Sequence, residues 1–222
     1  MVSATGKGRQ RRTEGKRRHQ QIIEGTLRLI ARDGIRAVRH RAVAKEAGVP
    51  LAATTYYFSD IGQLLSEAFT WFAEQRAGAV AALQQRLQDC LVRAESEPDG
   101  GREQLVEDIA GALAEHVIGQ AAAPEDRAIE LAFKHEAWRD EGLRALSEQQ
   151  ERRFVADVEA LLEKTGSPDP YADSQIFLGL IYRLEAELTF GELPAADARR
   201  VLRRAVALQL GLPVPGRPVP EG

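Results

Sequence analysis

Residues 38–58 read VRHRAVAKEAGVPLAATTYYF, and this stretch predicts two short helices joined at Gly48. A glycine readily adopts the left-handed backbone conformation that ends a helix, and Val49 can fill the corner that follows. Apolar side chains at helical spacing mark the inner face of the first helix: Val38, Ala42, Val43 and Ala47. Two short helices hinged in this way have the shape of a unit that reads DNA.

The second helix, expected over Leu51–Phe58, carries small, hydroxyl-bearing and aromatic side chains in place of a charged face. Such a helix can approach a groove closely and offer hydroxyl groups to phosphates and base edges. Consecutive residues lie about 100° apart around a helix, so these side chains cannot all face DNA. We therefore expect Phe58 and one of residues 54–57 to belong to the core.

The charge of the chain is divided unevenly along its length. Residues 1–58 carry 13 Lys/Arg against 4 Asp/Glu, whereas residues 59–222 carry 17 against 29, for a net charge of −3. A positive N-terminal segment suits a polyanion, and an acidic remainder would be repelled by the same polyanion. A solvated basic tail with no partner is the alternative. At 222 residues and 44% hydrophobic, the composition is that of a soluble globular protein.

Cys90 is the one cysteine of the sequence, so neither an intrachain disulfide nor a thiolate metal cluster can form. The N-terminus is basic and has no apolar run behind it, which predicts neither a signal peptide nor a membrane anchor. We expect a cytoplasmic protein with no membrane partner, no metal and no cofactor.

Helical patterns separated by Gly- and Pro-containing breaks continue to the end of the chain. Asp60 can cap a long helix that runs from Ile61 towards Pro98. No stretch of alternating β-branched residues intervenes, so we predict an all-α fold of about nine or ten helices. The other expected helices span residues 18–33, 104–118, 125–165 (two helices, joined near 140–142), 172–190 and 195–210. We expect residues 1–17 to form a flexible basic arm, because they hold too few apolar side chains to pack.

The sequence resembles the tetracycline-repressor (TetR) family of bacterial transcription regulators over roughly residues 18–65. The resemblance rests on Gly34-Ile35, on VAKEAGVP at 43–50 and on AATTYYFSDIGQL at 52–64. It implies a three-helix helix-turn-helix DNA-binding domain at residues 18–64, a helical effector-binding and dimerisation domain at 65–211, and a flexible tail at 212–222. Members are mostly repressors, so we expect a homodimeric repressor that binds a palindromic double-stranded DNA operator and is released by a small-molecule effector.

Three residues depart from the pattern of the family. Thr55 stands at the position of the usual first Tyr, Tyr57 at the position of the usual His, and Ile61 at the position of a Lys that contacts phosphate. Because Ile61 is neutral, part of the affinity for the DNA backbone has to come from other side chains.

The DNA-binding residues implied by the resemblance lie at the start of the first hinged helix and along the second. Arginine head groups suit phosphates, and we favour Arg41 most strongly. A solvated charged helix end is the alternative for these side chains, and Leu51 and Ala52 could line the turn without touching a base. The expected set is Arg39, His40, Arg41, Leu51, Ala52, Thr54, Thr55, Tyr56 and Tyr57, with Thr54 the weakest member.

Two further sets of residues are expected in the C-terminal part. For an effector pocket we name the aromatic residues of the middle helices, although such residues are more often plain core: Phe69, Phe72, His116, Phe133, Trp138 and Phe177. The resemblance implies a dimer contact between the last two long helices, expected near 148–163 and 173–190. For it we name Phe154, Val158, Leu161, Leu162, Ile176, Leu180, Leu184 and Leu188. Packing within one subunit is the alternative for this second set.

Motifs of the common enzyme classes are missing from the sequence. His135-Glu136 begins like a zinc-protease motif but has no second His at the required position, and no phosphate-binding or dinucleotide-binding glycine pattern occurs. We therefore expect no catalytic site. The alternative from another class is an all-α interaction or adaptor protein whose hinged pair of helices is structural packing without sequence-specific DNA binding.

Overall fold

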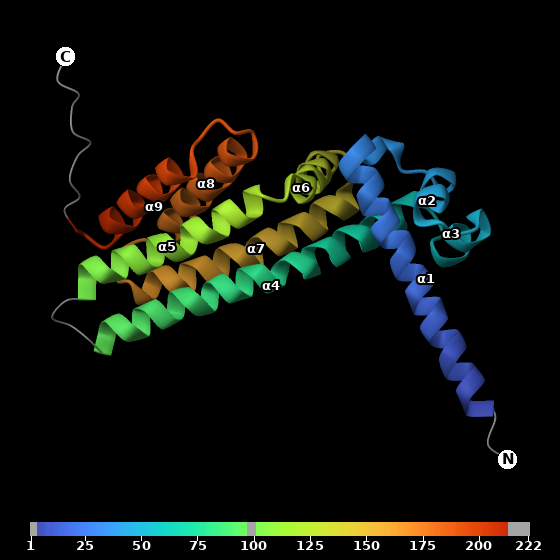
Figure 1. Cartoon of the computed structure of the whole chain (residues 1–222), viewed down its shortest axis with the longest axis horizontal. Helices are drawn as coiled ribbons and strands as arrows, with labels where there is room; N and C mark the ends of the chain where they lie inside the picture. Colours follow the sequence, from blue (N-terminus) through green and yellow to red (C-terminus); the bar gives the residue numbers. More distant parts are fainter. Residues whose placement is uncertain (1–3, 97–100, 213–222) are drawn as a thin grey trace. The chain divides into compact units, whose positions relative to one another are not determined.

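The computed structural model describes residues 4–96 and 101–212, and this part of the chain contains nine α-helices, one short 3-10 turn and no strand. Figure 1 labels the helices and colours them along the sequence, from blue at the N-terminus to red at the C-terminus. Their bounds are α1 Ala4–Asp33, α2 His40–Ala47, α3 Leu51–Tyr57, α4 Ile61–Ser96, α5 Gly101–Ala121, α6 Pro124–Glu136, α7 Glu141–Lys164, α8 Pro170–Thr189 and α9 Ala195–Gln209, with the 3-10 turn η1 at Ile35–Ala37. The all-α prediction is confirmed.

The first helix is longer than the sequence predicts. We expect a flexible arm at residues 1–17, but α1 is helical from Ala4, so that expectation is wrong for 4–17. No proline interrupts this segment, and its Lys, Arg and Gln residues favour helix, so the amphipathic helix that follows extends backwards through them. Residues 1–3 and the expected tail from residue 213 onward lie outside the described residues.

Capping side chains set where α4 and α8 begin. Gln63 N–H donates to Asp60 Oδ1 at 2.8 Å, and Ser59 N–H donates to Gln63 Oε1 at 2.8 Å, which is a reciprocal cap at the start of α4. Ala172 N–H donates to Asp169 Oδ1 at 3.0 Å at the start of α8. The sequence predicts the cap at Asp60 correctly.

Two compact units make up the chain. The first comprises residues 1–76 and 125–150, and the second comprises 77–124 and 151–222. In the first unit, buried side chains of α1 to α4, α6 and the start of α7 form one core that includes Ile22, Val43, Phe58, Leu64 and Phe133. In the second unit, α5 packs against α8 and α9 around a core that includes Val117, Leu184 and Leu202.

Candidate nucleic-acid interface and ligand cavity

The turn between α2 and α3 has the geometry that the sequence predicts. Gly48 ends α2 in the left-handed conformation, at φ 66° and ψ 32°. Val49 N–H donates to the Ala44 carbonyl at 3.0 Å, and the Val49 side chain packs against the core of the first unit. The chain therefore turns sharply after Gly48, and α3 begins at Leu51 with its direction fixed by α2.

The helix α3 has one buried and one exposed face. Thr54 and Phe58, at its inner side, are fully buried, whereas Tyr56 is 81% exposed. Leu51, Ala52 and Thr55 are also exposed. The outer face therefore offers two hydroxyl groups and two small or medium apolar side chains to a partner.

The expectation that Thr54 contacts DNA is wrong. Its side chain is wholly buried, and its hydroxyl donates to the Leu51 carbonyl at 2.8 Å within the same helix. Thr54 is the core member of residues 54–57, since its position one turn before Phe58 places both residues on the inner face.

Tyr57 is half-buried, and His19 of α1 lies beside it. The His19 ring packs edge-on to Tyr57 with centroids 5.7 Å apart and is stacked on Phe58 at 4.9 Å. His19 Nε2 also lies 2.9 Å from Glu67 Oε2 of α4. His19 of α1 therefore packs against the C-terminal end of α3 and is paired with Glu67 of α4. Its position one helical turn before Ile22 and Ile23 is the sequence signal that places His19 near the core face of α1.

The start of α2 gathers three basic residues, which the structure places differently. Arg39 Nη1 donates to the carbonyls of Arg36 and Val38, both at 2.8 Å, so its head group is held against the backbone. His40 is half-buried, and its Nδ1 has no hydrogen-bond partner among the described residues. Arg41 is exposed. Of the three, Arg41 is the side chain that can extend furthest towards a phosphate.

Asp60 joins the end of α3 to the start of α4 by a charged cap. The hydrogen bond from the Gln63 N–H is the main reason that the pKa of Asp60 lies below its usual range. The hydrogen bond from the Ser59 hydroxyl lowers the pKa of Asp60 further. The charge of His40 lowers the pKa of Asp60 further, by a smaller amount. A carboxylate in this place stays ionised and fixes the backbone next to the exposed face of α3.

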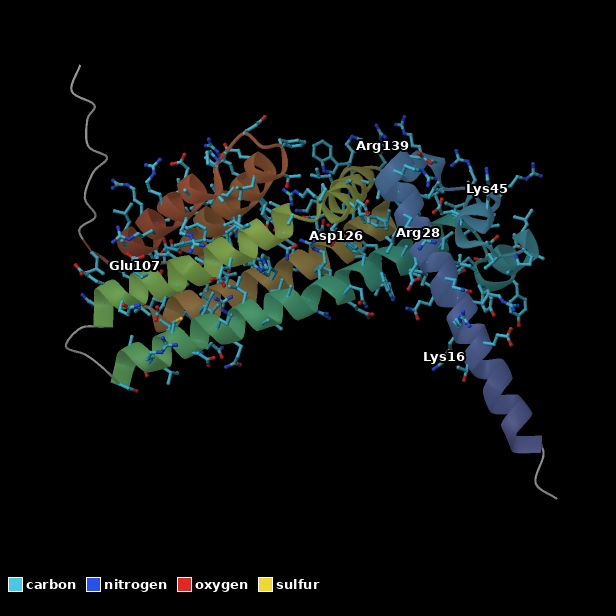
Figure 2. All side chains as sticks on the ribbon, in the orientation of Figure 1. Lys16, Arg28, Lys45, Glu107, Asp126 and Arg139 are labelled. Carbon is cyan, nitrogen blue, oxygen red and sulfur yellow. The ribbon has the colours of Figure 1, made fainter. Side chains whose placement is uncertain are left out.

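A pair of arginines on α1 holds α2 in place. Arg28 Nε lies 3.2 Å from Glu46 Oε1, and Arg32 Nη1 lies 2.9 Å from Glu46 Oε2. The hydrogen bond from Arg32, followed by that from Arg28, keeps the pKa of Glu46 below its ordinary value. Figure 2 labels Arg28 on α1 and Lys45 on α2. These ion pairs are not readable from the sequence, because the partner of each residue lies on another helix.

The second unit contains an apolar cavity of about 110 Å³, counted as the space open to the centre of a water molecule. Side chains of α4, α5, α7, α8 and α9 line it, and Phe177 is the one residue of the expected pocket set among them. Four residues expected at a dimer contact line this cavity instead: Phe154, Val158, Leu161 and Leu162. Leu162 is buried and the other three are half-buried within their own unit, which favours the alternative of packing within one subunit.

The other residues of the expected pocket set lie elsewhere. Phe72 and Phe133 are buried in the core of the first unit, and Phe69 packs edge-on to Phe133 with ring centroids 5.1 Å apart. Trp138 is 82% exposed, and His116 is half-buried on α5 outside the cavity lining. The pocket assignment is therefore corrected for these five residues, because aromatic residues at helical spacing occur in the core and on the surface as well.

The remaining dimer candidates all lie on α8, in different surroundings. Leu184 is buried in the core of the second unit, so its assignment to a dimer contact is wrong. Leu180 and Leu188 are partly buried and pack against that core, whereas Ile176 is 66% exposed. Tyr171 and Phe190, which are not in the expected dimer set, are exposed at the two ends of α8. Ile176 stays a predicted dimer contact.

Residues 4–96 and 101–212 contain neither a membrane-spanning helix nor a cluster of metal-binding side chains. The described helices include none with the length and apolar content needed to cross a lipid bilayer. No cluster of three or more His, Cys, Asp or Glu side chains in these ranges has an arrangement that could hold a metal ion.

Comparison with known proteins identifies relatives over most of the chain. Residues 22–68 match the model of the bacterial regulatory proteins of the tetR family. The HTH-type transcriptional regulator BetI of Agrobacterium fabrum is 33% identical over 158 residues, which are 70% of this chain and 68% of that protein. The HTH-type nicotine-responsive transcriptional repressor HdnoR of Paenarthrobacter nicotinovorans is 29% identical over 102 residues, which are 46% of this chain and 53% of that protein.

A solved structure is similar over nearly its whole length. The multidrug binding protein EbrR, complexed with ethidium, matches with a TM-score of 0.56 and 27% identity, over 89% of this chain and 99% of that chain.

Proposed function

The chain belongs to the TetR family of bacterial DNA-binding transcriptional regulators, and we propose that it is a repressor that a small-molecule effector releases from its operator. The observation that carries this proposal is the two-sided α3. Its inner face is anchored by Thr54 and Phe58, and its outer face leaves Tyr56 81% exposed. An adaptor that uses α3 only for packing has no need of an exposed tyrosine on that helix.

We propose that Leu51, Ala52, Thr55 and Tyr56 contact the major groove and its flanking phosphates. Methyl and isobutyl groups can meet thymine methyls, and hydroxyl groups can bond to phosphates or base edges. Tyr57 contributes through its hydroxyl group, since its ring is half-buried beside His19. Arg41, together with His40 and Arg39 at the start of α2, supplies contacts to the DNA backbone.

We propose that the working form is a homodimer on a palindromic operator. A single α3 touches too few base pairs for useful specificity, whereas a symmetric pair reads two half-sites about one helical turn apart. The exposed apolar side chains of α8, Tyr171, Ile176 and Phe190, are the proposed contacts with the partner subunit.

The effector site of the proposal is the apolar cavity of the second unit. Two similar proteins support an effector site: HdnoR is a nicotine-responsive repressor, and EbrR is a multidrug binding protein with ethidium bound. An effector releases DNA if it binds more tightly to a conformation whose two α3 helices no longer match the half-sites. We assign DNA binding to residues 18–64, and effector binding and dimerisation to residues 65–211. In this proposal the chain acts without catalysis.

Selection of bound sequences from random DNA duplexes tests the proposal. The repressor is expected to enrich one palindromic site and to hold it at physiological salt. Binding to that site should survive replacement of Ser96 by Ala, an exposed change on α4, but weaken when Thr55 and Tyr56 are both replaced by Ala. Enrichment of no sequence, with weak binding that salt abolishes, would favour the adaptor instead.

A further inference from the structure

Gln84 lines the apolar cavity of the second unit and carries a buried amide nitrogen. It lies on α4 and lines the cavity together with Leu87, Phe177 and Ile181. Its Nε2 atom is buried and has no hydrogen-bond partner among the described residues. An amide N–H in an apolar environment is costly when it has no acceptor, so this donor is a position where a bound molecule can gain a hydrogen bond.

The other two polar side chains of the cavity wall are already engaged within the protein. Thr165 Oγ1 donates to the Leu162 carbonyl at 2.7 Å. Gln209 Nε2 donates to Asp173 Oδ2 at 2.7 Å. Gln84 is therefore the one lining side chain of the described residues whose buried amide nitrogen has no hydrogen-bond partner.

The cavity wall is uncharged. Its described lining includes no Asp, Glu, Lys, Arg or His side chain. An ion that entered would lose its hydration shell without gaining an opposite charge, which is strongly unfavourable. A neutral molecule pays no such cost, and its apolar surface gains from leaving water. The volume of about 110 Å³ far exceeds the roughly 10–15 Å³ that holds one water molecule, so there is room for an organic molecule.

From these observations we infer that the cavity selects an uncharged, mainly apolar molecule with one hydrogen-bond acceptor, such as a carbonyl oxygen, which accepts from Gln84 Nε2. This inference rests on the proposed function, because it names the chemical class of the effector. Gln84 orients the molecule, and the surrounding leucine and phenylalanine side chains supply most of the affinity.

Two neutral probes of the same skeleton isolate the hydrogen bond. Benzophenone has a carbonyl group where diphenylmethane has a methylene group. Isothermal titration calorimetry on the full chain compares the wild type with Gln84→Met, which keeps the length of the side chain but loses the donor. Gln85→Met is the matched control, because Gln85 is exposed on the same helix and donates to Asp89 Oδ1 at 2.9 Å. Circular dichroism checks that each variant is folded.

The wild type is expected to bind benzophenone roughly threefold to tenfold more tightly than diphenylmethane. That preference should disappear in Gln84→Met and persist in Gln85→Met. Ethidium, an aromatic cation, should bind more weakly than benzophenone. An equal preference in wild type and Gln84→Met, tighter binding of ethidium, or no binding of either neutral probe would each overturn the inference.

The same samples separate this inference from the proposed function. Addition of benzophenone to the protein on its selected operator reports whether the occupied cavity releases DNA. If benzophenone binds with the Gln84 dependence described and the operator stays bound, release by this cavity is wrong but the ligand class stands. If the operator binds normally and the Gln84 dependence is missing, the ligand class is wrong but the DNA-binding function stands.

Discussion

Gly25 of α1 faces Ala47 of α2 at a contact that leaves no room for a side chain. A Cβ atom added at Gly25 would lie 2.8 Å from the Ala47 Cβ and 3.0 Å from the Ala47 Cα. Carbon atoms that are not bonded favour separations of about 3.5–4.0 Å. The close approach brings α2 against α1 one residue before the turn at Gly48, so Gly25 helps to set the position of α3.

Replacement of Gly25 by Ala is therefore expected to destabilise the protein, although alanine favours helix. Overpacking of this kind costs about 1–3 kcal/mol. Gly78→Ala is the matched control, because an added Cβ at Gly78 on α4 meets no atom within 4 Å. That control should stabilise the protein by up to about 1 kcal/mol through helix propensity. Urea denaturation measures both, and equal effects of the two substitutions would show that the contact with Ala47 is not tight.

The Tyr56 hydroxyl is expected to contribute to operator binding. Tyr56→Phe removes one hydroxyl from an exposed side chain, so the free energy of unfolding should change little. Affinity for the selected operator should fall by about twofold to tenfold, the value of one hydrogen bond. Ser96→Ala, which removes one hydroxyl from an exposed residue of α4, should leave affinity unchanged. A fluorescence anisotropy titration that finds the two variants alike would remove the Tyr56 hydroxyl from the interface.

Arg41→Ala is expected to weaken operator binding and to make it less sensitive to salt. Each lost phosphate contact lowers the slope of log affinity against log salt concentration by about 0.9. Arg102→Ala, an exposed arginine on α5, is the control and should leave the slope as it is. An unchanged slope in Arg41→Ala would mean that this guanidinium does not reach a phosphate.

Glu130 on α6 is expected to make the stability of the first unit dependent on pH. Arg127 Nη1 lies 2.9 Å from Glu130 Oε2, and Lys134 Nζ lies 3.0 Å from Glu130 Oε1. Burial raises the pKa of Glu130, but Lys134, Arg127 and Arg76 outweigh burial and hold the pKa below the ordinary 4.5. The carboxylate therefore stabilises the folded state above pH 4.5, and this contribution is lost as the pH falls through the lower folded pKa.

Glu130→Gln should accordingly cost about 1–2 kcal/mol at pH 7, because Arg127 and Lys134 lose their nearby negative charge. The difference from wild type should shrink as the pH is lowered below 4.5. Glu14→Gln, an exposed change on α1, should have little effect at either pH. Chemical denaturation at pH 7 and pH 4 measures the difference, and a gap that widens in acid would contradict the assigned direction of the pKa.

The helices follow from the sequence because each is encoded within its own segment. Gly48 and Asp60 act on neighbouring backbone groups, so the turn after α2 and the start of α4 are readable from spacing alone. The inner face of α3 is partly readable for the same reason: Phe58 is correctly placed in the core, and its partner there is one of residues 54–57. Thr54 lies one helical turn before Phe58, so helical periodicity alone identifies it as that partner.

The cavity and the supporting contacts are not readable in this way. Apolar residues at helical spacing look the same whether they face a core, a cavity or a second subunit, and Phe154 and Val158 line a cavity where a dimer contact is expected. His19 and Glu46 act through partners on other helices, and no local pattern names those partners. These contacts depend on which helices meet, which is a property of the folded chain.

Methylation interference on the selected operator tests most directly whether α3 lies in the major groove. Dimethyl sulfate methylates guanine at N7 in the major groove and adenine at N3 in the minor groove. The account predicts that N7 methylation blocks binding in two symmetric half-sites about one helical turn apart. Interference confined to adenine N3, or binding that N7 methylation leaves unchanged, would contradict it.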